Sequence, residues 1–218
     1  MKKAIILIAM VTLSVTSSYA QSETTTTTTT SNNREKLFFG LKIGTNYSNV
    51  YDTQGQDFVA DSKFGLAGGG FVSIPIGTYF GVQPEVLYSQ RGYKSSGTFL
   101  GSSYSMTRTT DYFDIPLLVA FKPIENLTLL FGPQFSYLMK QKDDFTGGSI
   151  TSTQEQTYTN DNYRKNIFCL TGGVDLNVDH LVIGLRTGWD VSNNNGDGTS
   201  TTPRYKNIWY QATIGFRF

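Results

Sequence analysis

Two residues of this chain could supply catalytic or metal chemistry, and neither has the partners that such chemistry needs. His180 is the only histidine and Cys169 the only cysteine. Hydrolytic and acyl-transfer sites combine a nucleophile with a histidine base and a carboxylate. His180 lies between two alternating segments and is typical of a turn residue, while Cys169 lies on such a segment and is typical of a packing residue. We therefore expect no enzyme, no metal site and no cofactor.

Two glycine-rich segments resemble ligand-binding loops only in part. Asn193–Gly198 matches the start of a calcium loop, but Arg204 stands where the bidentate glutamate should be, which favours a polar surface loop. Gly68–Gly70 lies on an alternating segment that no helix follows, so a phosphate-binding loop is not expected there.

Six charged residues share one face of these alternating segments, the face opposite the apolar one. Three are cations and three are anions: Lys42, Arg186 and Arg217 with Glu85, Asp114 and Asp175. Buried charges must pair, because an unpaired one costs several kcal/mol. We interpret them as one salt-bridged network, chiefly Glu85 and Asp114 with Arg186 and Lys42, around which glycines make room. A proton or ion path is the alternative.

Eight segments position these residues, each with an apolar or aromatic residue at every second position. Such alternation predicts strands with one apolar face. No outward position in them is charged, as expected of a lipid-facing surface. Pro84, Pro116 and Pro133 interrupt three of them, and each removes a ladder donor. The segments are Phe39–Tyr47, Phe64–Ile74, Phe80–Tyr88, Phe113–Phe121, Leu127–Tyr137, Phe168–Leu176, Leu181–Trp189 and Ile208–Phe218.

The connections alternate between short and long. We expect four long, mobile loops at Val50–Lys63, Gly92–Thr110, Lys140–Asn166 and Ser192–Lys206, and short turns near Pro75–Tyr79, Lys122–Asn126 and Asn177–His180. Short periplasmic turns opposite long external loops are typical of outer-membrane barrels. The sequence thus predicts an all-β fold, a closed eight-stranded antiparallel up-and-down transmembrane β-barrel.

The N-terminal region predicts export. Lys2 and Lys3 precede an apolar run, and Ser18–Ala20 offers small residues for cleavage, which indicates a signal peptide over residues 1–20. Residues 21–36 are threonine-rich and predict a disordered periplasmic spacer, and residues 37–218 form the barrel domain. Loss of both lysines changes the formal charge from +1 to −1, so no nucleic-acid partner is expected.

The C-terminal strand also resembles an assembly signal. Phe216 and Phe218 end the chain on alternating aromatics, and Gln211 supplies the polar residue seven places before the end. This pattern is similar to the signal by which the barrel-assembly machinery recognises outer-membrane barrels. Thr213 departs from the glycine that the signal prefers five places before the end.

Three motifs resemble the PorT-like outer-membrane β-barrel family. They are Gly81–Gly92, Asp111–Leu118 and Leu129–Phe135, and they contain the three prolines. The resemblance spans about residues 36–218 and implies an eight-stranded barrel in a Gram-negative-type outer membrane. It implies no biochemical activity, since fold does not fix function.

We therefore expect a non-catalytic integral outer-membrane barrel with a plugged lumen, in contact with outer-membrane lipid. Its role would be structural or adhesive, with an envelope or extracellular protein as partner for the long loops. Two alternatives remain open at this stage: small-solute transport or a secretion-associated role, and a soluble lipocalin-like lipid binder with the apolar face inward.

Overall fold

The computed structural model describes residues 32–51, 60–99, 102–147, 150–157, 166–192 and 205–218. They belong to one compact unit, Asn32–Phe218. The predicted signal peptide, most of the predicted spacer and the calcium-like segment Asn193–Gly198 lie outside the described residues. Among the described residues, no helix has the length and apolar character needed to cross a membrane.

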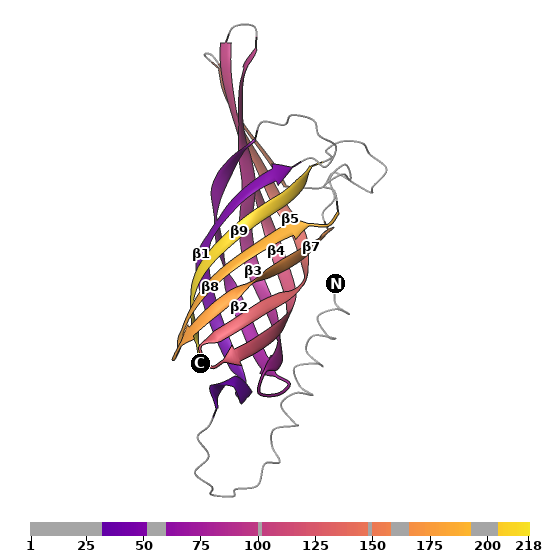
Figure 1. Ribbon diagram of the computed structural model, residues 1–218. Coiled ribbons are helices and arrows are strands. Elements are labelled where there is room, and N and C mark those ends of the chain that lie inside the picture. The colour runs from indigo at the N-terminus through magenta and orange to yellow at the C-terminus, as the bar shows by residue number, and fades with distance from the viewer. Residues whose placement is uncertain (1–31, 52–59, 100–101, 148–149, 158–165, 193–204) are drawn as a thin grey trace, which may run out of the picture. The chain divides into compact units, whose positions relative to one another are not determined.

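Eight strands form a closed antiparallel ring, as the sequence predicted (Figure 1). The ring runs β4-β3-β2-β1-β9-β8-β7-β5, and β4 pairs with β5 to close it. The first and last strands pair from Gly40↔Arg217 to Tyr51↔Lys206, so neither edge stays open to hydrocarbon. The strands are β1 (Phe38–Tyr51), β2 (Asp61–Pro75), β3 (Phe80–Phe99), β4 (Ser102–Ile124), β5 (Leu127–Gly147), β6 (Ile150–Thr157), β7 (Asn166–Val178), β8 (Leu181–Asp190) and β9 (Lys206–Arg217).

The apolar face of every barrel strand points outward. Leu41, Ile43 and Phe64 are each more than 60% exposed, whereas Lys42 and Asn46 between them in sequence are buried. Large apolar groups outside and polar groups inside are what a membrane-spanning barrel requires. The lipocalin-like alternative needs the opposite arrangement and was wrong.

Aromatic side chains form two exposed bands on this outer face. One lies toward the long connections (the long-loop end): Tyr47, Tyr88, Phe113, Tyr137, Phe168 and Tyr210. The other lies toward the short connections (the short-turn end): Phe39, Phe80, Phe121 and Phe218. Aromatic rings suit the two membrane interfaces, so the bands mark the borders of the hydrocarbon layer.

The three prolines are accommodated inside strands. The β3–β4 pairing is interrupted beside Pro84, between Pro84↔Leu117 and Leu87↔Asp114, and resumes in the same register. The β4–β5 pairing is interrupted beside Pro116 and Pro133, between Pro116↔Gln134 and Val119↔Phe131, and also resumes in the same register. A proline cannot donate to the ladder, so local gaps of this kind let the strands continue on both sides.

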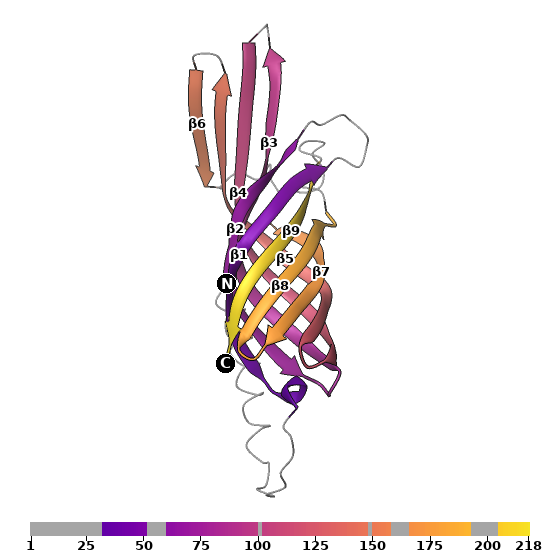
Figure 2. The same ribbon diagram turned by 60° about the vertical axis from the view of Figure 1, so that its left-hand side comes forward.

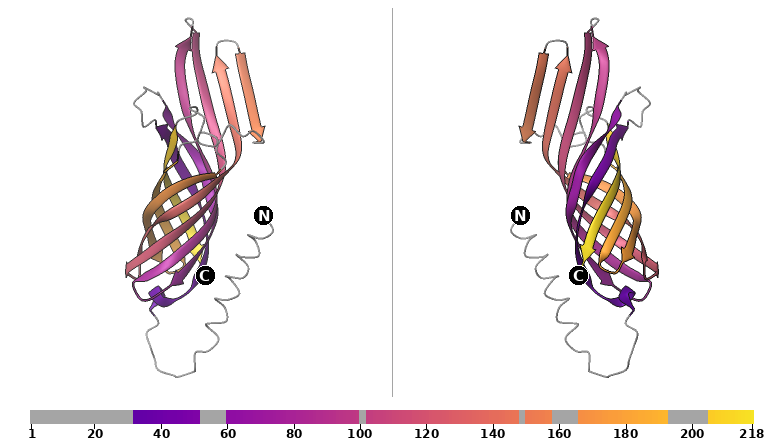
Figure 3. Two further views of the ribbon diagram at one scale, coloured as in Figure 1. Left: turned by 90° about the vertical axis from the view of Figure 1, so that its right-hand side faces the viewer. Right: turned by 90° about the vertical axis from the view of Figure 1, so that its left-hand side faces the viewer.

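For two of the four predicted mobile loops, Gly92–Thr110 and Lys140–Asn166, the prediction was wrong over the described residues, which form strands. The sheet continues beyond the barrel as four paired strand segments, 93–99 of β3, 102–110 of β4, 140–147 of β5 and all of β6, which we call the sheet extension. Figure 2 and both views of Figure 3 show it standing above the other strand ends. Its segments lack an apolar face because they lie outside the membrane, so apolar alternation could not reveal them.

The sheet changes register where the extension leaves the barrel. β5 shifts between Asp111↔Lys140 and Tyr112↔Leu138. On β3, Gly92 has φ +148°, and a Cβ there would lie 2.0 Å from the carbonyl oxygen of Arg108. Only glycine fits this close backbone approach.

An exposed acid illustrates the polar surface of the extension. A hydrogen bond from Lys142, at 2.9 Å, and another from Thr153, also at 2.9 Å, hold the pKa of Asp144 below its usual range. The bond from Thr153 crosses from β6 to β5 and therefore ties these two strands together.

The end of the predicted spacer is ordered, which corrects the prediction of disorder for residues 32–36. Asn33–Glu35 form a 3-10 turn, η1, capped by the side chain of Asn32. Thr78 donates to Glu35 at 2.5 Å, and Lys122 donates to the Arg34 carbonyl oxygen at 3.2 Å. Contacts with the β2–β3 turn and with β4 hold η1 at the short-turn end, where Figure 1 shows it in indigo.

Candidate functional site

The lumen holds a central cluster of four charges from four strands. Lys42 of β1 and Arg186 of β8 contact Glu85 of β3 at 2.9 and 2.6 Å, and Arg186 also contacts Asp175 of β7 at 3.2 Å. Gln83 donates to Glu85 at 2.8 Å. These side chains are at most 4% exposed, and two positive charges balance two negative ones. Such a cluster bridges the barrel from β1 to β7.

Glycines make the space for these long side chains. A Cβ at Gly173 would lie 2.6 Å from Cγ of Arg186, and a Cβ at Gly184 would lie 2.7 Å from a carboxylate oxygen of Asp175. Both distances are too short for a real contact. The narrow bore of an eight-stranded barrel thus has room for these charged side chains because the residues beside them are glycines, which have no side chain.

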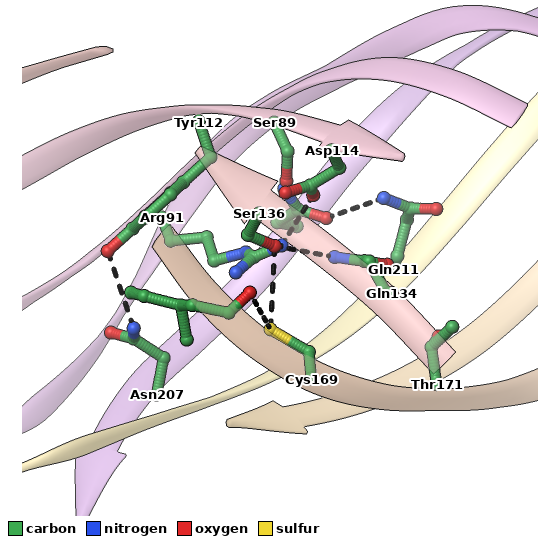
Figure 4. Close-up of polar contacts among 12 residues, drawn as sticks. Ser89, Arg91, Tyr112, Asp114, Gln134, Ser136, Cys169, Thr171, Asn207 and Gln211 are labelled. Atoms are coloured by element: carbon green, nitrogen blue, oxygen red, sulfur yellow. Dashed lines mark hydrogen bonds and ion pairs between the residues drawn. The ribbon is translucent and has the colours of Figure 1, made fainter. Parts of the chain in front are cut away.

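A second cluster lies in the half of the lumen toward the long-loop end, and Figure 4 shows the polar contacts within it. Arg91 pairs with Asp114, and its guanidinium lies 3.5 Å from the Trp209 ring centre and 4.7 Å from that of Tyr112. A second carboxylate, of Asp190, lies 4.0 Å from Arg91. The arginine is fully buried between two aromatic rings, which closes the lumen at this level.

Neutral donors also belong to the second cluster. The backbone amide and side-chain amide of Asn207 donate to Asp190 at 2.9 and 2.5 Å. The Cys169 thiol lies 3.2 Å from the same carboxylate and 3.4 Å from the Ser136 hydroxyl. Cys169 is completely buried, so it serves as a packing and hydrogen-bonding residue.

The six charges predicted from sequence do not form one group. Lys42, Glu85, Asp175 and Arg186 meet in the central cluster, but Asp114 pairs in the second cluster. Arg217 lies at the short-turn end, where its Nε donates to the Asp179 carbonyl oxygen at 2.7 Å.

Sequence reasoning missed Arg91 and Asp190. The alternating segments assigned from the sequence end at Tyr88 and Trp189. Arg91 lies on the inward face of β3 beyond Tyr88, and Asp190 lies on that of β8 beyond Trp189, so the same alternation extended past these aromatic residues predicts both as inward charges.

The remaining predicted residues lie where β1 pairs with β9 and in the β7–β8 turn. Gln211 is buried and donates to Asn46 at 3.0 Å across the β1–β9 pairing, while Phe216 and Phe218 face outward. The backbone of Phe218 exchanges hydrogen bonds with Phe39 at 2.8 and 3.0 Å. His180 lies in the β7–β8 turn, and its ring stacks on that of Phe216 of β9, with ring centres 5.2 Å apart.

The lumen side chains are packed against one another. Each lumen cluster joins groups from at least four strands by hydrogen bonds and ion pairs, and the largest side chains, Trp209 and Arg91, are fully enclosed. Within the described residues, no group of three or more His, Cys, Asp or Glu side chains could hold a metal ion.

Comparison with known proteins agrees with this architecture. The family described as "Outer membrane protein beta-barrel domain" matches residues 16–215. Comparison with curated proteins gives no significant match.

Solved structures with a similar fold include Ail of Yersinia pestis, at 14% identity and TM-score 0.45 over 83% of this chain and 98% of that one. Neisserial surface protein A has 13% identity and TM-score 0.45, over 83% and 97%. OprG of Pseudomonas aeruginosa has 12% identity and TM-score 0.35, over 83% and 95%. Identities this low concern the fold alone. The family match covers most of the chain, and the chain therefore belongs to the outer membrane protein β-barrel domain family.

Proposed function

We propose that this protein is a non-catalytic, integral outer-membrane barrel that anchors the sheet extension at the cell surface for contact with a protein partner. The proposal includes export with a cleaved signal peptide, insertion by the barrel-assembly machinery, and kinship with the PorT-like group. The observation that carries it is the combination of a closed lumen with a sheet extension that has an open edge.

The open edge belongs to β6. This strand pairs with β5 from Lys140↔Thr157 to Gly147↔Ile150, and no other described strand pairs with it. An unpaired edge exposes a row of backbone donors and acceptors, to which an extended peptide can add as a further strand. The polar sequence of β6 keeps this edge soluble when it is unoccupied.

The side chains of β6 and β5 fix the shape of the edge. Lys140 and Glu155 form an ion pair of 2.6 Å between the strands, and Asp144 is bonded to Thr153. Cross-strand pairs of this kind hold the hairpin in one register. A partner strand would meet a pre-formed edge and would need to order only itself.

The experiment removes the edge and leaves the barrel. Residues 142–155 are replaced by Asn-Gly, which joins the paired positions Gln141 and Gln156 through a two-residue hairpin turn. A photo-crosslinking residue at Lys140, which lies on β5 next to β6 and is retained in both variants, should capture a discrete partner on intact cells carrying the wild type and none on cells carrying the shortened variant.

The matched control shortens the neighbouring hairpin. Replacing residues 95–106 by Asn-Gly joins the paired positions Lys94 and Thr107 and keeps β6. Equal loss of the partner in both variants would show that β6 is not the contact edge. Retention in both would contradict the proposal.

Small-solute transport is the second candidate, and the packed lumen disfavours it. We expect no stable single-channel current from the purified protein in planar bilayers, because Arg91, Trp209 and Tyr112 occupy the bore at one level. A steady current that changes its ion selectivity in Glu85→Gln would establish a conducting lumen.

A further inference from the structure

Three cationic side chains converge on one cavity at the short-turn end of the lumen. Arg34 comes from η1, Lys122 from β4 and Arg217 from β9. The space open to the centre of a water molecule is about 10 Å³, which is room for about one water-sized atom. The rest of the lining is mostly polar and includes Gln83 and Asn177. This cavity borders the central cluster through Gln83, which donates to Glu85 at 2.8 Å, and none of the second-cluster residues lines it.

Among the described residues, no ion pair within 4.0 Å holds the positive charges at this cavity. Lys122 and Arg217 are only 5% and 8% exposed. The ammonium group of Lys122 donates to the Arg34 carbonyl oxygen at 3.2 Å, and Nε of Arg217 donates to the Asp179 carbonyl oxygen at 2.7 Å. Both acceptors are neutral backbone groups. Burial of a cation without a counter-charge is unfavourable, so an anion entering this cavity would be stabilised.

The third cation, Arg34, also donates to a neutral backbone acceptor. Nη1 of Arg34 donates to the Pro123 carbonyl oxygen at 3.3 Å, and its guanidinium lies 5.0 Å from the Tyr79 ring centre. Over the described part of the chain, no ion pair within 4.0 Å joins Arg34, Lys122 or Arg217 to a carboxylate. Three cations from three elements therefore face one small space, and none of them forms an ion pair with a described carboxylate.

We propose that this cavity is an anion site that takes one oxygen of a phosphate group. The cavity admits one atom of this size, and the remaining oxygens would meet the η1 side, where Arg34 lies. A guanidinium presents several N–H donors in a plane and an ammonium offers a compact charge, a combination that suits a phosphate with several acceptor oxygens. The group can come from inorganic phosphate or from a phospholipid headgroup at the membrane surface on the short-turn side.

One carboxylate competes for the site. Glu125 lines the cavity but is exposed, and no ion pair holds it to any of the three cations. Its negative charge opposes the approach of phosphate. The affinity should therefore rise when Glu125 is neutralised and fall when a cavity cation is neutralised.

The test is a titration of the purified barrel in a nonionic detergent with inorganic phosphate, at constant ionic strength maintained with chloride. Backbone amide resonances of η1 report binding. We expect saturable shifts in the wild type, about tenfold weaker binding in Lys122→Gln and in Arg217→Gln, and tighter binding in Glu125→Gln. Lys36→Gln is the matched control, because Lys36 is an exposed cation next to η1 that does not line the cavity.

Two results would overturn the proposal. One is the absence of saturable shifts in both the wild type and Glu125→Gln. Because Glu125 is exposed, this substitution should not disturb folding. The other is an equal loss of affinity in Lys36→Gln and Lys122→Gln, which would indicate general charge screening. A second arm distinguishes the sources: in nanodiscs, a lipid headgroup would produce the bound η1 resonances without added phosphate, whereas an inorganic phosphate site would still titrate.

Discussion

Removing Arg186 from the central cluster should destabilise the barrel strongly. The arginine contacts Glu85 at 2.6 Å and Asp175 at 3.2 Å, and all three side chains are buried. In Arg186→Leu the cluster retains two carboxylates and the single cation Lys42, so it carries one uncompensated negative charge. Breaking a buried pair in this way costs about 3–5 kcal/mol.

A second substitution should recover part of that loss. Asp175→Asn in the Arg186→Leu background leaves Lys42 and Glu85, which already pair at 2.9 Å, and restores neutrality. The double variant should therefore be more stable than the sum of the two single losses predicts, by about 0.5–3 kcal/mol.

The assay is equilibrium urea unfolding in detergent or lipid, followed by the fluorescence of Trp209 and Trp189. Arg217→Leu combined with Asp175→Asn is the control, because Arg217 forms no ion pair with the central cluster. This control pair should be additive. Additivity within about 0.5 kcal/mol for the Arg186 and Asp175 pair as well would refute the reasoning.

Three further predictions concern assembly, orientation and pH. Deleting Phe218 should leave little protein in the outer membrane, whereas Phe131→Ala, a mid-barrel loss of similar apolar area, should assemble normally; equal assembly would reduce Phe218 to a lipid-facing side chain. A cysteine at Gln154 should react with an impermeant maleimide on intact cells, and one at Lys36 only after the outer membrane is opened; the reverse pattern would invert the orientation. Because the pKa of Asp144 is lowered in the folded state, its stabilisation of the β5–β6 hairpin is complete above the ordinary value of 3.8 and is lost as the pH falls through the lower folded value. Protection of the hairpin amides against hydrogen exchange should therefore stay level from about pH 5 to 8 and drop below about pH 4.

Local alternation was enough to predict the barrel. A strand that separates lipid from a polar lumen must alternate, and that requirement shows in residues such as Leu41, Lys42 and Ile43 without knowledge of their neighbours. The same rule placed Glu85, Asp175 and Arg186 on the inner face. The short connections followed from the residues between alternating segments.

Only the tertiary structure decided which inward charges meet and where the sheet ends. Whether Asp114 reaches Arg91 or Arg186 depends on register and on the height of each residue along the bore, and register is fixed by pairing between segments far apart in sequence. The sheet extension escaped prediction because its strands border water on both faces and need no apolar alternation. η1 escaped for a related reason, since its order comes from contacts with Thr78 and Lys122 and not from its own polar sequence.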